Sequence, residues 1–202
     1  LRALFELAVS WSSFVIDDFE FEISDQTATL TSSICPEKIK ELLIPESVKF
    51  NDTNYHVTVI GANSFEGCSN WTGEITIPKY VTSIGDFAFS QCEGFTGNLN
   101  LPDQITSIGN NSFRQCHGLD GTLHLPENLV TIGYNAFYMC SKLMGDLKIP
   151  SNVTSIGFQS FISCSGFDGI ITIPNKVQTI GYSAFSGCFN IKGDLHIPED
   201  IE

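Results

Sequence analysis

Six cysteines recur at an interval of 24 residues, and they are the side chains of this sequence best suited to chemistry. They are Cys68, Cys92, Cys116, Cys140, Cys164 and Cys188. In stacked coils their neighbours would lie about 5 Å apart, a separation at which disulfides or a shared metal could be considered. However, side chains of one column point the same way, and the C-x-x-C and histidine clusters of zinc sites are missing. We therefore interpret these six, and Cys35 outside the register, as small buried hydrophobic residues.

Carboxylates on one outward column are the candidates for hydrolytic chemistry. Asp146 and Asp194 are separated by Ile170 on that column, which predicts a distance of roughly 10 Å. An inverting glycosidase pair falls in this range, but no groove of basic and aromatic residues accompanies the two acids. The sequence also contains no nucleophile–base pairing and no glycine-rich phosphate loop. We therefore do not expect an enzyme.

Metal sites are also disfavoured. His124 and His196 share a column but lie three coils apart, too far to hold one ion. Asp103 and Glu127 follow prolines on adjacent coils and could form a weak calcium site, although a solvated acidic edge explains them more simply. We expect neither a metal ion nor another cofactor.

The elements that position these residues repeat with the same period as the cysteines. Glycines stand at Gly61, Gly85, Gly109, Gly133, Gly157 and Gly181, and prolines at Pro78, Pro102, Pro126, Pro150, Pro174 and Pro198. Three residue types with different physical roles keep one register. This regularity indicates a solenoid in which each coil covers the apolar face of the next.

Residues 97–120 illustrate one coil. Leucines alternate with asparagines over residues 98–101, which predicts a short strand with one face inside. Ile105 and Ile108 predict a second extended run, and Gly109 is expected to turn the chain with a positive φ. A short helical turn should follow, with phenylalanine and cysteine on its inner side. The equivalent phenylalanines are expected to stack as a buried column: Phe65, Phe89, Phe113, Phe137, Phe161 and Phe185.

The unit at residues 147–164, Leu-Lys-Ile-Pro-Ser-Asn-Val-Thr-Ser-Ile-Gly-Phe-Gln-Ser-Phe-Ile-Ser-Cys, resembles the BspA-type (treponemal-type) leucine-rich repeat. The resemblance covers about residues 19–202. It implies a leucine-rich-repeat solenoid that is right-handed and β-rich, with a parallel sheet on one face and short helical turns on the other. It also implies surface or secreted proteins that adhere to host matrix proteins and to other microbes, although intracellular members exist. The shared motif residues are structural, so no functional residue is transferred.

The register divides the chain into three parts. Residues 1–18 carry apolar residues at helical spacing, and they either cap the stack as a helix, which we favour, or end a secretion signal. Residues 19–72 form a capping hairpin and an irregular first repeat, with a second hairpin turning at residues 51–54. Residues 73–202 are regular repeats with no visible C-terminal cap, so we expect the natural protein to continue.

The charge of the chain limits its partners. It has 10 basic and 23 acidic residues and a net charge of −13, which disfavours nucleic acid and anionic membranes. No stretch is long and apolar enough to span a bilayer. The expected partners are proteins, either host matrix and surface proteins or other microbial surface proteins; the sequence does not indicate an oligomeric state.

Two outward strand columns vary in chemistry while the inner columns do not, as recognition surfaces on a fixed scaffold do. A merely solvated face is the alternative. The candidate binding residues are Glu74, Thr76, Asn98, Asn100, Thr122, His124, Asp146, Lys148, Ile170 and Thr172. We expect an extracellular or cell-surface adhesion and protein-interaction module, with an intracellular scaffold or a structural stalk as alternatives.

Four sequons are present, at Asn51, Asn70, Asn110 and Asn152. They would accept glycans only if a eukaryotic cell secretes the chain. Such triplets also arise by chance in a repeat that is rich in asparagine and threonine.

Overall fold

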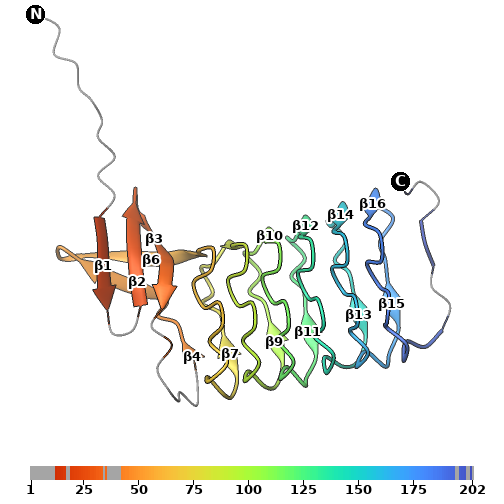
Figure 1. Ribbon diagram of the computed structural model, residues 1–202. Coiled ribbons are helices and arrows are strands. Elements are labelled where there is room, and N and C mark those ends of the chain that lie inside the picture. The colour runs from red at the N-terminus through yellow and green to blue at the C-terminus, as the bar shows by residue number, and fades with distance from the viewer. Residues whose placement is uncertain are drawn as a thin grey trace, which may run out of the picture.

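The computed structural model describes residues 12–16, 19–33, 35, 42–193, 196–198 and 201 of the chain. The fold is a β-solenoid of about five turns of the leucine-rich-repeat type. Its coils stack in chain order from a β-rich N-terminal cap towards the C-terminus (Figure 1). The described residues contain no helix, and each coil is built from two-residue strands joined by turns.

Each coil contributes to two parallel ladders. The first ladder is interrupted and consists of three separate two-stranded parallel sheets: β4 (Leu42–Leu43) with β7 (Ile75–Thr76), β9 (Leu99–Asn100) with β11 (Leu123–His124), and β13 (Leu147–Lys148) with β15 (Ile171–Thr172). The second contains β8 (Ser83–Ile84), β10 (Ser107–Ile108), β12 (Thr131–Ile132), β14 (Ser155–Ile156) and β16 (Thr179–Ile180). Equivalent residues pair directly, as Leu123 with Leu99 and Ile132 with Ile108. A parallel sheet is confirmed, but it is continuous only in the second extended run, because the first run is divided into three pairs of strands.

Left-handed residues, not a helix, turn the chain after the second ladder. In one coil these are Asn111 and Gln115, with φ of 57° and 60°. Equivalent residues of other coils share this conformation: Asn63, Gly67, Phe87, Gln91, Asn135, Met139, Gln159, Ser163, Ser183 and Gly187. Because a left-handed residue at every fourth position interrupts the right-handed run that a helix needs, the predicted short helical turns are wrong. The backbone bonds to the next coil instead, and Phe113 N–H donates to the Ala136 carbonyl at 2.8 Å.

The glycines that recur every 24 residues, which we call the glycine column, are needed for a different reason from the one predicted. Gly109 does not have a positive φ, so that prediction is wrong. A Cβ at Gly109 would lie 2.5 Å from the carbonyl carbon of Gly85 and 2.6 Å from the nitrogen of Asp86. Gly133 would meet Gly109 at 2.6 Å in the same way. Glycine is therefore required because the backbones of adjacent coils approach too closely for any side chain.

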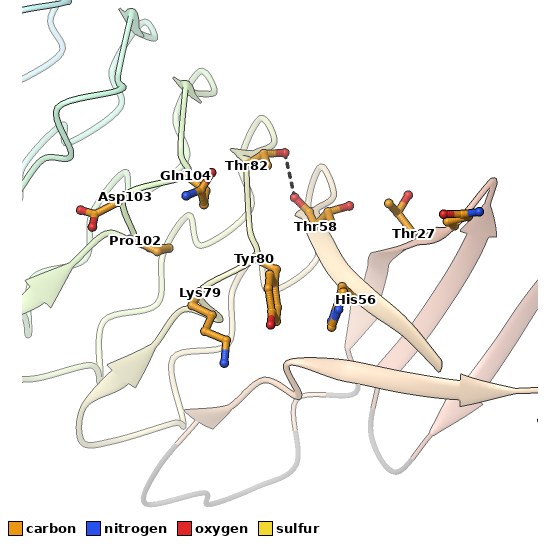
Figure 2. Close-up of a pocket in the computed structure, with 10 residues that line it drawn as sticks. Thr27, His56, Thr58, Lys79, Tyr80, Thr82, Pro102, Asp103 and Gln104 are labelled. Atoms are coloured by element: carbon orange, nitrogen blue, oxygen red, sulfur yellow. Dashed lines mark hydrogen bonds between the residues drawn. The ribbon is translucent and has the colours of Figure 1, made fainter. Parts of the chain in front are cut away.

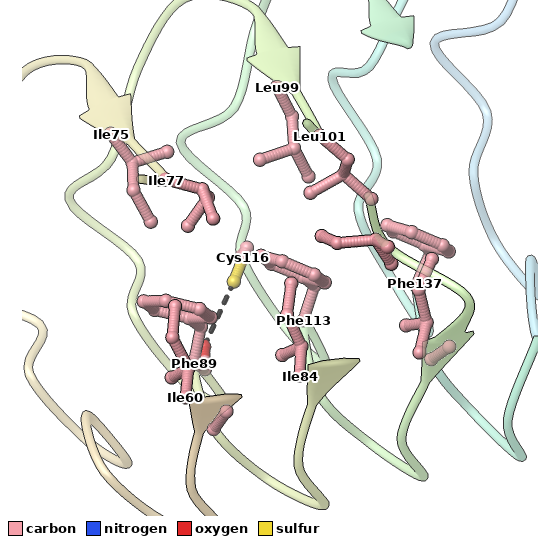
Figure 3. Packing of buried hydrophobic residues seen from close by; sticks show 14 of the residues in the cluster. Ile60, Ile75, Ile77, Ile84, Phe89, Leu99, Leu101, Phe113, Cys116 and Phe137 are labelled. Carbon is pink, nitrogen blue, oxygen red and sulfur yellow. Dashed lines mark hydrogen bonds between the residues drawn. The ribbon is translucent and has the colours of Figure 1, made fainter. Parts of the chain in front are cut away.

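The phenylalanine column forms the centre of the core (Figure 3). Successive ring centroids lie 4.9, 5.1, 5.4, 5.2 and 5.6 Å apart, and their planes are nearly parallel. Five of the rings are buried: Phe65, Phe89, Phe113, Phe137 and Phe161. Phe185, in the last regular coil, is half-buried. The expected packing of equivalent residues on one another is confirmed.

The N-terminal cap extends the second ladder into a ten-stranded sheet. Its strands are β1 (Ser12–Ile16), β2 (Phe19–Ser24), β3 (Thr27–Ser33), β5 (Ser47–Phe50) and β6 (Thr53–Ile60). Strands β2 and β3 form one antiparallel hairpin and β5 and β6 another, so both predicted hairpins are confirmed. Strand β6 also pairs in parallel with β3 and β8. The helix predicted for residues 1–18 is wrong for Ser12–Ile16, which pairs with β2 as a strand; the rest of that segment lies outside the described residues.

A disulfide joins the cap to the first coil. Cys35 and Cys68 are bonded, with their Cα atoms 5.3 Å apart. The interpretation of these two residues as packed thiols is therefore wrong. Cys35 belongs to the irregular cap and not to the column, so its side chain is not constrained to point the same way as that of Cys68. The bridge closes a loop across a sequence separation of 33 residues, which restricts the unfolded chain.

Candidate functional site

The outward side chains of the first ladder lie in a strip along the stack, which we call the strand face. All ten predicted binding residues lie on it, and all are exposed. The pleat produces this arrangement, because Leu123 and Leu125 point into the core while Thr122 and His124 point outward. The strand face is therefore held at fixed spacing by the core beneath it.

A groove of about 440 Å³ runs across the middle of the strand face. It brings together half of the predicted residues: Asn100, Thr122, His124, Asp146 and Lys148. The other five, Glu74, Thr76, Asn98, Ile170 and Thr172, lie outside the groove. Glu127, for which the sequence suggests either a weak calcium site with Asp103 or a solvated acidic edge, also lines the groove.

Some of these polar side chains hold adjacent coils together. Asn98 Oδ1 accepts hydrogen bonds from the backbone N–H and the hydroxyl of Thr122, at 2.8 and 2.9 Å. Asp146 Oδ1 accepts from Ile170 N–H at 3.0 Å, and its other oxygen lies 3.6 Å from Lys148 Nζ. Asn98 and Asp146 therefore support the scaffold, which leaves His124 and Lys148 better placed to contact a partner.

A second, larger concavity of about 780 Å³ lies where β6 meets the first coils, and we call it the cap hollow (Figure 2). Its lining residues are Gln26, Thr27, His56, Thr58, Lys79, Tyr80, Thr82, Pro102, Asp103 and Gln104. They come from the β2–β3 turn, from β6 and from the loops that follow two of the repeat prolines.

Stacked side chains form one wall of the cap hollow. The His56 and Tyr80 rings lie 3.9 Å apart and 29° from parallel, and Figure 2 shows Tyr80 between His56 and Lys79. Lys79 Nζ is 4.9 Å from the centre of the Tyr80 ring and 2.9 Å from Glu46 Oε2. The hydrogen bond to Glu46, and then its charge, raises the pKa of Lys79, so this amine stays protonated at neutral pH.

The amino-acid sequence carries only a weak signal for the cap hollow. Its main wall joins an inserted hairpin to the loop of the following coil, and such a contact has no equivalent in the other coils. Tyr80 is the one hint, because the same repeat position carries Gln104, Asn128, Asn152 and Lys176 elsewhere. An aromatic residue at a repeat position that is otherwise polar is therefore the one sequence feature that points to the cap hollow.

The five remaining thiols of the cysteine column are structural. Each donates a hydrogen bond to a phenylalanine carbonyl on the preceding coil at 3.0 to 3.2 Å, as Cys116 does to Phe89 in Figure 3. Burial raises the pKa of Cys92 and Cys140 to about 12. A thiol that is neutral and already bonded is a poor nucleophile and a poor metal ligand. Within the described part of the chain, no group of three or more His, Cys, Asp or Glu residues could hold a metal ion.

The acidic candidates do not converge. Asp103 lines the cap hollow and Glu127 lines the strand-face groove, so they belong to different sites. Glu127 also accepts hydrogen bonds from the backbone and hydroxyl of Ser151. Asp194, considered above as the partner of Asp146, lies outside the described residues.

The four sequons differ in accessibility. Asn51 and Asn70 are exposed. Asn110 Nδ2 instead donates to Asp86, and Asn152 Nδ2 donates to the Glu127 carbonyl. A glycan attached at Nδ2 would disrupt these bonds between coils, so Asn51 and Asn70 are the better acceptors.

Two ladders of equal coils around one apolar core define a leucine-rich-repeat solenoid. Residues 44–166 and 95–202 match the BspA type Leucine rich repeat region, with six copies. The chain belongs to the family of BspA-type leucine-rich repeat proteins.

Solved structures agree with this assignment. A leucine-rich repeat protein of Bacteroides ovatus is 32% identical, with a TM-score of 0.75 over 89% of this chain. The chain spans 46% of that protein. The leucine-rich repeat protein of T. pallidum has the same fold, with a TM-score of 0.78, 24% identity, and coverage of 93% of this chain and 84% of the other. Among curated proteins, none matches the chain. The described residues include no helix that could cross a membrane.

Proposed function

We propose that this chain is a cell-surface or secreted adhesion module that binds host or microbial proteins through the strand face. One observation carries the proposal. Ten exposed side chains of differing chemistry lie in register on a ladder whose buried neighbours are nearly uniform. Variation on a rigid scaffold is how repeat proteins build recognition surfaces.

Rigidity favours binding by such a face. Each strand of the first ladder is fixed by the core, and the Asn98 and Asp146 bonds fix the loops before the next strands. A partner therefore meets a surface that loses little conformational entropy on association. Because Asp146 is already engaged with the next coil, we also favour binding over catalysis on this face.

The disulfide supports a location outside the reducing cytosol. Structural disulfides persist in oxidising compartments and are rare in cytosolic proteins, so the bond between Cys35 and Cys68 favours the surface or secreted alternative over the intracellular scaffold. The buried thiols of the column suit such a compartment, because their raised pKa values suppress the thiolate needed for disulfide exchange.

Binding to immobilised matrix proteins and microbial surface proteins tests the proposal. The double variant His124→Glu and Lys148→Glu changes the charge of the strand-face groove without touching the core. Gln178→Glu with Lys176→Glu makes the same change in net charge away from the groove, and serves as the matched control. We expect the groove variant to lose binding and the control to keep it, with both melting like the wild type. Adhesion that survives the groove variant would favour the stalk alternative instead.

A further inference from the structure

We propose that the cap hollow is a binding site for a neutral saccharide. The site is separate from the strand face, and the inference does not depend on the function proposed for that face. At about 780 Å³ the hollow is large enough for one or two sugar units. Its walls come from four segments of the chain, two from the cap and two from successive coils, that only the folded chain brings together (Figure 2).

The chemistry of the walls suits a sugar. Five lining residues carry neutral hydroxyl or amide groups that can both donate and accept hydrogen bonds: Gln26, Thr27, Thr58, Thr82 and Gln104. His56 stacks on the Tyr80 ring and Lys79 lies over it, so the edges of this stack, together with the ring of Pro102, supply the apolar surface. A pyranose presents the same combination, with hydroxyl groups around its rim and C–H groups on its faces.

The charges in and around the hollow favour a neutral ligand. Lys79 is the one lysine among the lining residues, and its charge is compensated by Glu46 at 2.9 Å. Asp103 and the net charge of −13 would repel an anion. A cation would compete with the ammonium of Lys79, which already lies over the Tyr80 ring.

An extended peptide is a poorer fit, because peptides that bind sheets usually add a strand to a free edge. Strand β6 is paired with β3 on one side, and with β5 and β8 on the other. At the hollow, the Thr58 carbonyl accepts from Thr82 N–H at 2.8 Å, and Val57 N–H donates to the backbone carbonyl of Glu46 at 3.0 Å. Recognition therefore depends on side chains, as it does for a sugar.

The wall is ordered before any ligand arrives. Thr27 Oγ1 donates to the Ser24 carbonyl at 3.2 Å, and Thr82 Oγ1 donates to the Thr58 carbonyl at 3.1 Å. These bonds orient the hydroxyl oxygens, whose lone pairs can accept from sugar hydroxyls. The His56–Tyr80 stack fixes the aromatic part. A preorganised wall of this kind lowers the entropic cost of binding.

The same chemistry could come from a free oligosaccharide or from a glycan attached to a surface protein. Saturation-transfer NMR followed by calorimetry, using the full chain and a panel of neutral hexose and N-acetylhexosamine oligosaccharides, tests the shared chemistry. Sialylated and sulfated counterparts of the same oligosaccharides test the preference for neutral ligands. Capture of glycoproteins before and after enzymatic deglycosylation distinguishes the attached source from the free one.

Substitutions of lining residues test whether a saccharide binds in the cap hollow. We expect Tyr80→Ala to weaken binding by about tenfold through loss of the aromatic wall, while Tyr80→Phe keeps most of it. Tyr134→Ala, which removes an exposed tyrosine outside the hollow, should change nothing. His56→Ala provides a second test that leaves Tyr80 and the core in place.

The binding measurements on these variants either support or overturn the proposal. Binding of a neutral saccharide that depends on His56 and Tyr80 but not on Tyr134 supports the proposal. It is overturned if no neutral saccharide in the panel binds, if the charged counterparts bind better, or if the Tyr80→Ala and Tyr134→Ala variants behave alike. Thermal melting of each variant shows that a loss of binding is not a loss of fold.

Discussion

Replacing Phe113 by alanine should break the solenoid at its centre. The Phe113 side chain is 1% exposed and lies between the rings of Phe89 and Phe137, at 5.1 and 5.4 Å. Deleting a buried phenylalanine side chain costs about 3–5 kcal/mol, because the cavity adds to the lost transfer free energy. Two ring contacts at about 0.5–1.5 kcal/mol each place Phe113 towards the upper end of that range.

The chain contains its own control. Phe185 belongs to the same column but is half-buried, and its ring contact with Phe161 spans 5.6 Å. Since Phe185 is only partly buried and has one stacked neighbour in the column, Phe185→Ala should cost less, about 1–2 kcal/mol. The two variants make the same chemical change at positions that differ in burial and in the number of stacked ring neighbours.

Urea unfolding followed by circular dichroism measures the two losses, and hydrogen exchange locates them. In Phe113→Ala, faster exchange should spread from the central coils, because each coil is stabilised by its neighbours. In Phe185→Ala, the faster exchange should be confined to the C-terminal coils. Equal losses in the two variants, or a loss below about 1 kcal/mol for Phe113→Ala, would refute the argument from stacked rings.

Three further predictions concern the disulfide, the thiols and the buried serines. Reducing the bond between Cys35 and Cys68 should lower the free energy of unfolding by about 2–4 kcal/mol, and a Cys35→Ser variant should no longer respond to reductant. Stability should fall as pH rises from 9.0, the ordinary thiol pKa, towards about 12, the pKa of folded Cys140, because only the unfolded thiols ionise there; Cys140→Ala should show a shallower pH slope. Ser112→Ala should raise stability by about 1 kcal/mol, because its buried hydroxyl has no hydrogen-bond partner among the described residues and other coils carry alanine in that position; a lower unfolding midpoint would contradict this.

Contacts between equivalent residues could be predicted from the sequence, because in a solenoid each such residue meets its own counterpart. The stacking of Phe113 on Phe137 and the pairing of Leu99 with Leu123 follow from the period alone. The exposure of the strand face follows from the same alternation. The fold and the outline of one candidate site were therefore predictable.

Two features of the regular coils could not be predicted from the sequence. The left-handed turn residues include glutamine and methionine, as at Gln115 and Met139, which rarely adopt this conformation and give no signal for it. The regular spacing of the glycines is visible in the sequence, but the reason for glycine at these positions is the close contact between the backbones of adjacent coils. A sequence pattern that suits a tight turn and one that suits close backbone approach look the same.

Contacts within the cap escape prediction for another reason. The bond between Cys35 and Cys68, and the stack of His56 on Tyr80, each join an irregular segment to the first coils. No repeat constrains where an irregular segment lies in space. The cap hollow therefore became visible only in the folded chain.

The hydrogen bonds between coils have a mechanical consequence, because they run along the axis of the stack. A load applied between the two ends would pull on the bonds of one interface at a time, so the rod should peel instead of shearing as a whole. Each released coil of 24 residues would add roughly 80 Å to the length of the chain. The molecule should therefore extend in steps under load, one coil at a time. The covalent bridge at Cys68 lies at the end where peeling would otherwise reach the cap.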